Sequence, residues 1–119
     1  MKITIPISVG ELLDKISILQ IKSQHTDSSY VTKELEYLVI IAQENDVYNK
    51  NDLNKLLEVN SKLWDIEDRL RELEKGGIFD DEFIHNARLV YITNDKRSKI
   101  KRDINEYTNS ELVEVKLHK

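Results

Sequence analysis

The apolar residues between Leu56 and Leu73 recur at alternating spacings of three and four residues over nearly three heptads. This spacing places the side chains in one stripe along an α-helix and is typical of a seam along which helices pack. Gly76 and Gly77 follow directly, and glycine just after the last periodic residue is a common helix stop. The pattern therefore predicts a long helix with one face covered by other helices. The stripe consists of Leu56, Val59, Leu63, Ile66, Leu70 and Leu73.

Three further segments carry helical signals. Ser8 stands three residues before Glu11, which is the spacing of a capping box at a helix start. Asp80 can cap the last helix, which continues without glycine or proline to about Tyr107. Short connections favour antiparallel neighbours, so we expect a mainly α protein, an antiparallel four-helix arrangement in one domain over residues 1–119. The predicted helices cover residues 9–24, 30–44, 51–75 and 81–107.

The two ends of the chain carry a different pattern. Apolar and polar residues alternate over residues 3–7 and again over 113–118, where His118 is the last polar member. This period of two predicts short strands, and Pro6 makes the first an edge strand. In an antiparallel four-helix arrangement the first helix starts where the fourth ends. We therefore expect a small β-ribbon formed by the N- and C-terminal segments.

Composition excludes several classes of function. The chain has no cysteine, which excludes disulfides, thiolate metal sites and cysteine catalysis. A formal net charge of −4 argues against a general nucleic-acid binder, although basic residues cluster over 96–102. The longest apolar run, 38–42, is far too short to cross a bilayer, and the chain start does not resemble a signal peptide. We expect a cytoplasmic protein that binds neither membrane nor nucleic acid.

Three segments of the chain stand out as a set: IPISVGELLDKISILQIK (5–22), LWDIEDRLRELE (63–74) and FIHNARLVYITNDKRSKIKRDIN (83–105). Together they resemble a family of small uncharacterised bacterial and marine-phage proteins, a domain of unknown function. The resemblance covers most of the chain. It implies a setting beside glycosyltransferase or tetratricopeptide-repeat proteins, and it brings no catalytic residues that could be carried over.

A run of seven polar residues, Thr93 to Lys99, lies in the middle of the predicted fourth helix. A helix that packs along its whole length does not carry such a run. If the third and fourth helices form a hairpin, Trp64 lies near Tyr91, and Asp68 lies near Arg88. The resulting candidate ligand-binding site consists of Asn60, Trp64, Asp65, Asp68, Arg88, Tyr91, Asn94, Asp95 and Arg97.

Two interpretations of these polar residues stay open. A guanidinium beside aromatic rings can hold a phosphate or carboxylate, with the rings as a stacking surface. Alternatively, Asp65 or Asp68 simply pairs with Arg88, and the polar run is a solvated helix face.

Metal and catalytic motifs are weak. Asp65 and Asp68 share a helix face that Asp95 could approach, which would suit Mg²⁺, but the acidic signature of all-α nucleotide pyrophosphohydrolases is absent. Glu82 and His85 match half of a di-iron bundle motif without its second copy. No nucleophile motif is present. We expect no metal and no cofactor, and no catalytic residue can be assigned.

The function that the sequence favours is a non-enzymatic helical interaction module, acting as a homodimer and open to another protein partner. The third and fourth predicted helices are longer than the first two can cover, and Tyr37, Ile40 and Ile41 make the end of the second apolar nearly all round. The alternative is a binder or hydrolase of a phosphorylated small molecule, using the polar site between helices 3 and 4. Whether the chain is an enzyme stays open at this point.

Overall fold

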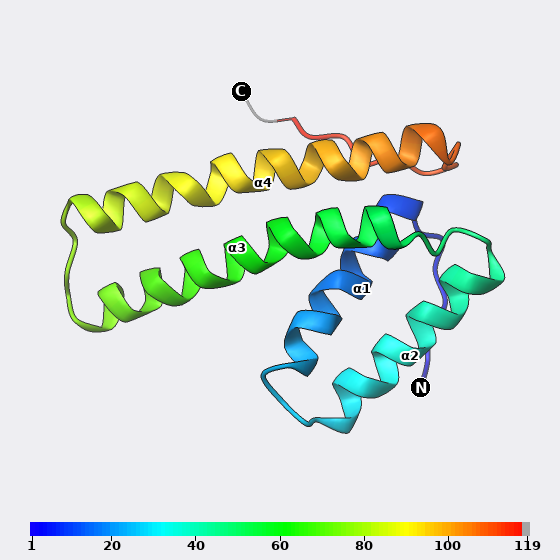
Figure 1. The fold of residues 1–119 in the computed structure, drawn as a ribbon, viewed down its shortest axis with the longest axis horizontal. Coiled ribbons are helices and arrows are strands. Elements are labelled where there is room, and N and C mark those ends of the chain that lie inside the picture. Colours follow the sequence, from blue (N-terminus) through cyan, green and yellow to red (C-terminus); the bar gives the residue numbers. More distant parts are fainter. Residues whose placement is uncertain (118–119) are drawn as a thin grey trace.

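The computed structural model describes residues 1–117, and four α-helices make up the regular structure of these residues (Figure 1). Each helix lies within one residue of its predicted bounds, so the prediction of a mainly α chain with four helices is confirmed. Local signals set these bounds, since the capping oxygens of Ser8 and Asp80 accept the backbone N–H of Glu11 and Phe83. The helices are α1 (Val9–Ser23), α2 (Ser29–Glu44), α3 (Lys50–Lys75) and α4 (Asp81–Tyr107).

Two helical hairpins make up the molecule. The helices α3 and α4 run side by side along its longest axis, and α1 and α2 form a shorter hairpin against one half of that pair (Figure 1). Of the described helices, α1 alone packs against all three others, whereas α2 packs only against α1. The far half of the α3–α4 pair, residues 64–92, extends past the shorter hairpin. We call this segment the arm.

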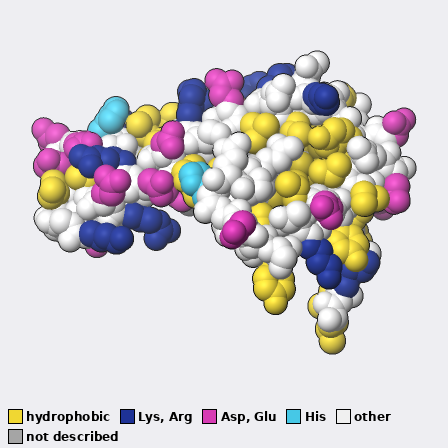
Figure 2. Space-filling model, turned by 60° about the horizontal axis from the view of Figure 1, so that its bottom comes forward, with side chains coloured by type: hydrophobic (Ala, Val, Ile, Leu, Met, Phe, Trp, Pro, Cys, Tyr) yellow, Lys and Arg dark blue, Asp and Glu magenta, His cyan; other side chains and the backbone are white. Residues whose placement is uncertain are grey.

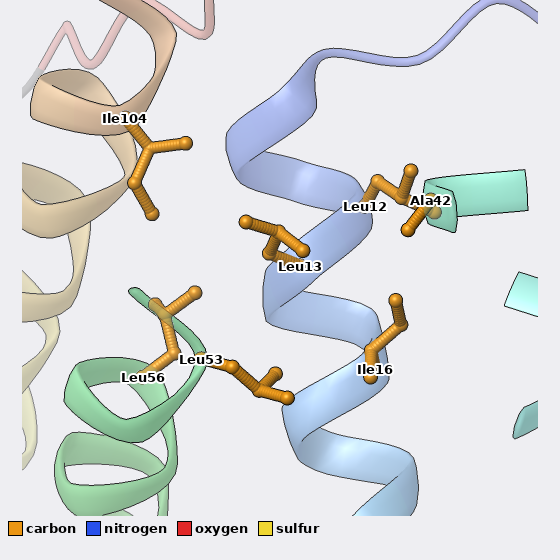
Figure 3. Close-up of a cluster of buried hydrophobic side chains, with 7 residues drawn as sticks. All are labelled: Leu12, Leu13, Ile16, Ala42, Leu53, Leu56 and Ile104. Carbon is orange, nitrogen blue, oxygen red and sulfur yellow. The ribbon is translucent and has the colours of Figure 1, made fainter. Parts of the chain in front are cut away.

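The hydrophobic core lies around α1 (Figure 3). Burying an aliphatic side chain contributes about 1.5–3 kcal/mol, so this cluster is the main source of stability. The arm is different, because Leu73 is the only side chain among its described residues that is buried. The core cluster consists of Leu12, Leu13, Ile16, Ala42, Leu53, Leu56 and Ile104.

The predicted β-ribbon is wrong, because residues 1–117 contain no strand. The start of α1 and the end of α4 do meet, since the Val9 N–H donates to Ser110 Oγ at 3.1 Å. Beyond that point the two segments diverge. Lys2 lies over the ring of Tyr37 on α2, with Nζ 4.7 Å from its centroid. Residue Glu114 instead folds back toward α4, and His118 lies outside the described residues.

None of the four described helices combines the length and apolarity needed to cross a bilayer.

Gly10 allows the closest approach between α1 and α4. Its N–H donates to Asn105 Oδ1 at 2.7 Å. A Cβ atom at this position would lie 2.6 Å from the backbone oxygen of Lys101, closer than such atoms can approach. The packing of α1 on α4 therefore requires glycine at this position.

The variant Gly10→Ala should lower the free energy of unfolding by about 1–3 kcal/mol, because backbone must move to admit the new methyl group. This loss should outweigh the gain of about 1 kcal/mol that alanine brings to a helix. Urea unfolding followed by circular dichroism measures it. Gly76→Ala is the matched control, since its new Cβ would make ordinary contacts, 3.4 Å from the flexible Ile78 side chain and 3.7 Å from the backbone oxygen of Glu72. A Gly10→Ala variant as stable as Gly76→Ala would contradict this packing argument.

Candidate functional site

Asp14 is the centre of a polar cluster where α1, α3 and α4 meet. Its side chain is 0% exposed. Arg97 of α4 donates from Nε to Asp14 Oδ1 at 3.0 Å and from Nη2 to Oδ2. Asn60 of α3 donates from Nδ2 to Oδ1 at 2.9 Å. A carboxylate removed from water is tolerated only with such partners, and here both neighbouring helices supply one.

Further hydrogen bonds extend the cluster along α1 and α4. Asn60 Nδ2 also donates to Ser17 Oγ at 2.8 Å, and Ser17 Oγ donates to the backbone oxygen of Asp14 at 2.7 Å. Asn94 lies beside the guanidinium, with its Oδ1 3.5 Å from Arg97 Nη1. The polar atoms around Asp14 therefore form one connected network rather than isolated pairs.

Lys101 forms the second charged centre of this region. Its Nζ lies 2.6 Å from Glu11 Oε2, 3.3 Å from Glu114 Oε1 and 3.8 Å from Asp14 Oδ2. Burial alone would lower the pKa of Lys101, but the hydrogen bond to Glu11 and the three nearby carboxylates together raise it. We call Glu11, Asp14, Ser17, Asn60, Arg97 and Lys101 the junction cluster.

The junction cluster is suited to holding helices together. The hydrogen bond between Arg97 and Asp14 raises the pKa of Arg97, so the guanidinium stays charged in the folded protein. The donors and acceptors of the cluster bond to one another. Among the described residues, no group of three histidine or acidic side chains is placed to hold a metal ion.

The nine residues that the sequence predicts as a ligand site do not form one site in the structure. Asn60, Asn94 and Arg97 come together beside Asp14. Trp64 stacks on His25, with ring centroids 4.5 Å apart. The remaining residues are exposed, and they are Asp65, Asp68, Arg88, Tyr91 and Asp95.

The alternative interpretation, in which Asp65 or Asp68 pairs with Arg88, finds no such pair among the ion pairs of residues 1–117. Arg69 makes the contact between the two helices instead, with Nε 2.7 Å from Glu82 Oε2. This hydrogen bond lowers the pKa of Glu82. The arm is therefore joined by an exposed ion pair, which contributes little to stability.

Sequence reasoning missed Asp14, Ser17 and Lys101. A signal was present, because the stripe of α1 that faces α3 and α4 contains Gly10, Asp14 and Ser17 at spacings of four and three. A glycine that allows close approach, followed by small or charged residues on an otherwise apolar helix, indicates a buried polar contact.

Two grooves lie between α3 and α4. The lysine groove has a volume of about 190 Å³ and contains three lysines, of which Lys62 pairs with Glu58 at 3.7 Å. It is lined by Lys55, Glu58, Val59, Lys62, Thr93, Lys96 and Ile100. The arm groove has a volume of about 300 Å³ and a mainly apolar floor. It is lined by Glu67, Leu70, Arg71, Glu74, Phe83, Ala87 and Val90.

Comparison with known proteins gives a family but no activity. The model of a family of unknown function, DUF6165, matches residues 1–119, and the chain belongs to this family. The resemblance to a domain of unknown function is thereby confirmed. No curated protein matches the chain. No solved structure matches it either.

Arg97→Met should lower the free energy of unfolding by about 3–5 kcal/mol, because it leaves the buried Asp14 carboxylate without its main countercharge. Methionine keeps most of the apolar stem, so lost packing contributes little. Arg88→Met is the matched control on the same helix, and as an exposed substitution it should change stability by less than about 0.5 kcal/mol. Equal urea midpoints for the two variants would show that Asp14 does not depend on Arg97.

Proposed function

We propose that this chain, as a member of a family of unknown function, is a single-domain, non-enzymatic interaction module that works in the cytoplasm as a homodimer. The observation that carries the proposal is the sparse burial of the arm. Over residues 64–92 two helices run together with one buried side chain, Leu73, at 2% exposure. A helix pair that buries so little needs a further partner to be well packed.

The surface of the shorter hairpin supports the same proposal. The outer face of α2 exposes Tyr30, Tyr37, Ile40 and Ile41. Hydrophobic side chains gather on the half of the molecule that holds α1 and α2, at the right of Figure 2, whereas many charged side chains cover the arm at the left. Contiguous apolar surface of this kind is typical of proteins that bind other proteins.

Light scattering at micromolar concentration should give about twice the chain mass of 14.0 kDa, because a second copy supplies the missing cover. A dilution series followed by circular dichroism shows whether helix content depends on assembly. A folded monomer at every concentration would contradict the homodimer.

A second candidate function is the binding or hydrolysis of a phosphorylated small molecule. The lysine groove favours it, because three lysines surround one opening on a chain whose formal net charge is −4. Lysine ammonium groups bind phosphate as point charges. The groove lies between α3 and α4 and includes Thr93 and Lys96 from the polar run, next to the predicted site residues Asn94 and Asp95.

Inorganic phosphate should raise the melting temperature at constant ionic strength if this second function holds, because a ligand that binds only the folded state stabilises it. Lys96→Ala should abolish the rise if the lysine groove is the site. Arg88→Ala should abolish it if the site lies around Trp64 and Arg88, as the sequence predicts. A wild-type protein whose melting temperature does not respond to phosphate would rule out both sites.

A further inference from the structure

The arm groove is a continuation of the surface on which α1 sits. Residues seven apart in a helix lie nearly on the same face. On α4, Val90 and Phe83 in the groove stand seven and fourteen residues before Arg97, which holds Asp14 of α1. On α3, Glu67 stands seven residues after Asn60, the other partner of Asp14. The groove therefore lies on the same faces of α3 and α4 as the surface that contacts α1.

No described residue outside α3 and α4 lines this part of the surface. Helix α1 ends at Ser23, and His25 stacks on Trp64 at the near end of the arm. Past that contact the apolar floor is open, and Ala87, which lines it, is exposed. A small side chain there allows another helix to approach closely. Beside the groove on α4, Ile84 and Tyr91 are 55% and 56% exposed.

We propose that the arm groove is the dimer surface and that its occupant is the arm groove of a second copy, so that two arms pack into a four-helix bundle. The proposal rests on the homodimer proposed above and adds the surface that forms it. Two helical hairpins that pack face to face are a common route to a four-helix bundle. A two-fold contact uses the same patch on both copies, and the symmetry closes at two chains.

The charges around the groove favour a second copy over a partner that carries one sign of charge. Its rim carries Glu67 and Glu74 together with Arg71. A purely basic partner would leave the arginine unmatched, and a purely acidic one would oppose both glutamates. A second copy brings both signs, so a two-fold contact can set each Arg71 opposite a glutamate of the other chain.

The outer face of α2 is the competing surface, and the chain's own N-terminal segment lies against part of it. Lys2 Nζ sits 4.7 Å from the ring centroid of Tyr37. The arm groove has no such cover among the described residues. Of the two apolar surfaces, the arm groove is therefore the more available to a second copy.

The test compares one substitution on each surface. Ala87→Arg places a long charged side chain in the lining of the groove and should raise the dimer dissociation constant at least about 100-fold. Because Ala87 is exposed, the helical circular dichroism signal should not change. The matched control is Ile40→Arg on the outer face of α2, where the side chain is also exposed, and this variant should stay dimeric. Light scattering and sedimentation give the masses.

The outcomes separate this proposal from the homodimer itself. A dimeric wild type with a monomeric Ala87→Arg variant supports both. A dimeric wild type whose dissociation is changed by Ile40→Arg and not by Ala87→Arg overturns the arm surface and leaves the homodimer standing. A monomeric wild type overturns both.

An independent readout uses the absence of cysteine in the chain. A single cysteine introduced as Ala87→Cys and labelled with pyrene should give excimer emission when two arms meet. The same label at Ile40→Cys should give none. Excimer emission from the α2 label alone would overturn the arm surface, whatever the masses show.

Discussion

Asp14 is a fully buried carboxylate on α1, which among the described helices is the one that packs against all three others. An unpaired charge in that position would cost several kcal/mol, so α1 can sit only where Arg97 and Asn60 reach it together. Gly10 permits the close contact with α4 that this position requires. One hydrogen-bonded group thus selects the face of the α3–α4 pair that α1 covers. Because α2 packs only against α1, the contacts of Asp14 also determine where the shorter hairpin lies. The arm is left uncovered as a result.

The helices could be predicted from the sequence because their signals are local: apolar spacing, a capping oxygen and a glycine stop. The terminal ribbon could not, because alternation describes an extended segment and says nothing about its neighbour. The two segments separate after the contact of Val9 with Ser110. Lys2 then packs over the ring of Tyr37, and Glu114 accepts a hydrogen bond from Lys101. No local sequence pattern predicts either contact.

The sequence pointed to part of the polar network around Asp14 for a related reason. Asn60, Asn94 and Arg97 stood out as polar residues in a packed helix pair, and the structure brings them together. Their shared partner, Asp14, lies on an apolar helix whose orientation the sequence leaves open. The contact of α1 with α3 and α4 could not be predicted. In the structure, Asn60 and Arg97 bind a buried carboxylate of the same chain, not an open ligand site. The open surface lies elsewhere, along the arm.

The central claim is that the Asp14–Arg97 contact, rather than the apolar core alone, fixes α1 on the α3–α4 pair. A double-mutant cycle with Asp14→Asn and Arg97→Met measures it most directly, because the cycle isolates the interaction between the two side chains from the separate cost of each change. Removing both charges should be less costly than the sum of the single losses, with a coupling energy above about 2 kcal/mol at neutral pH. A coupling energy below about 0.5 kcal/mol would contradict the claim, since contacting residues that depend on each other do not behave additively.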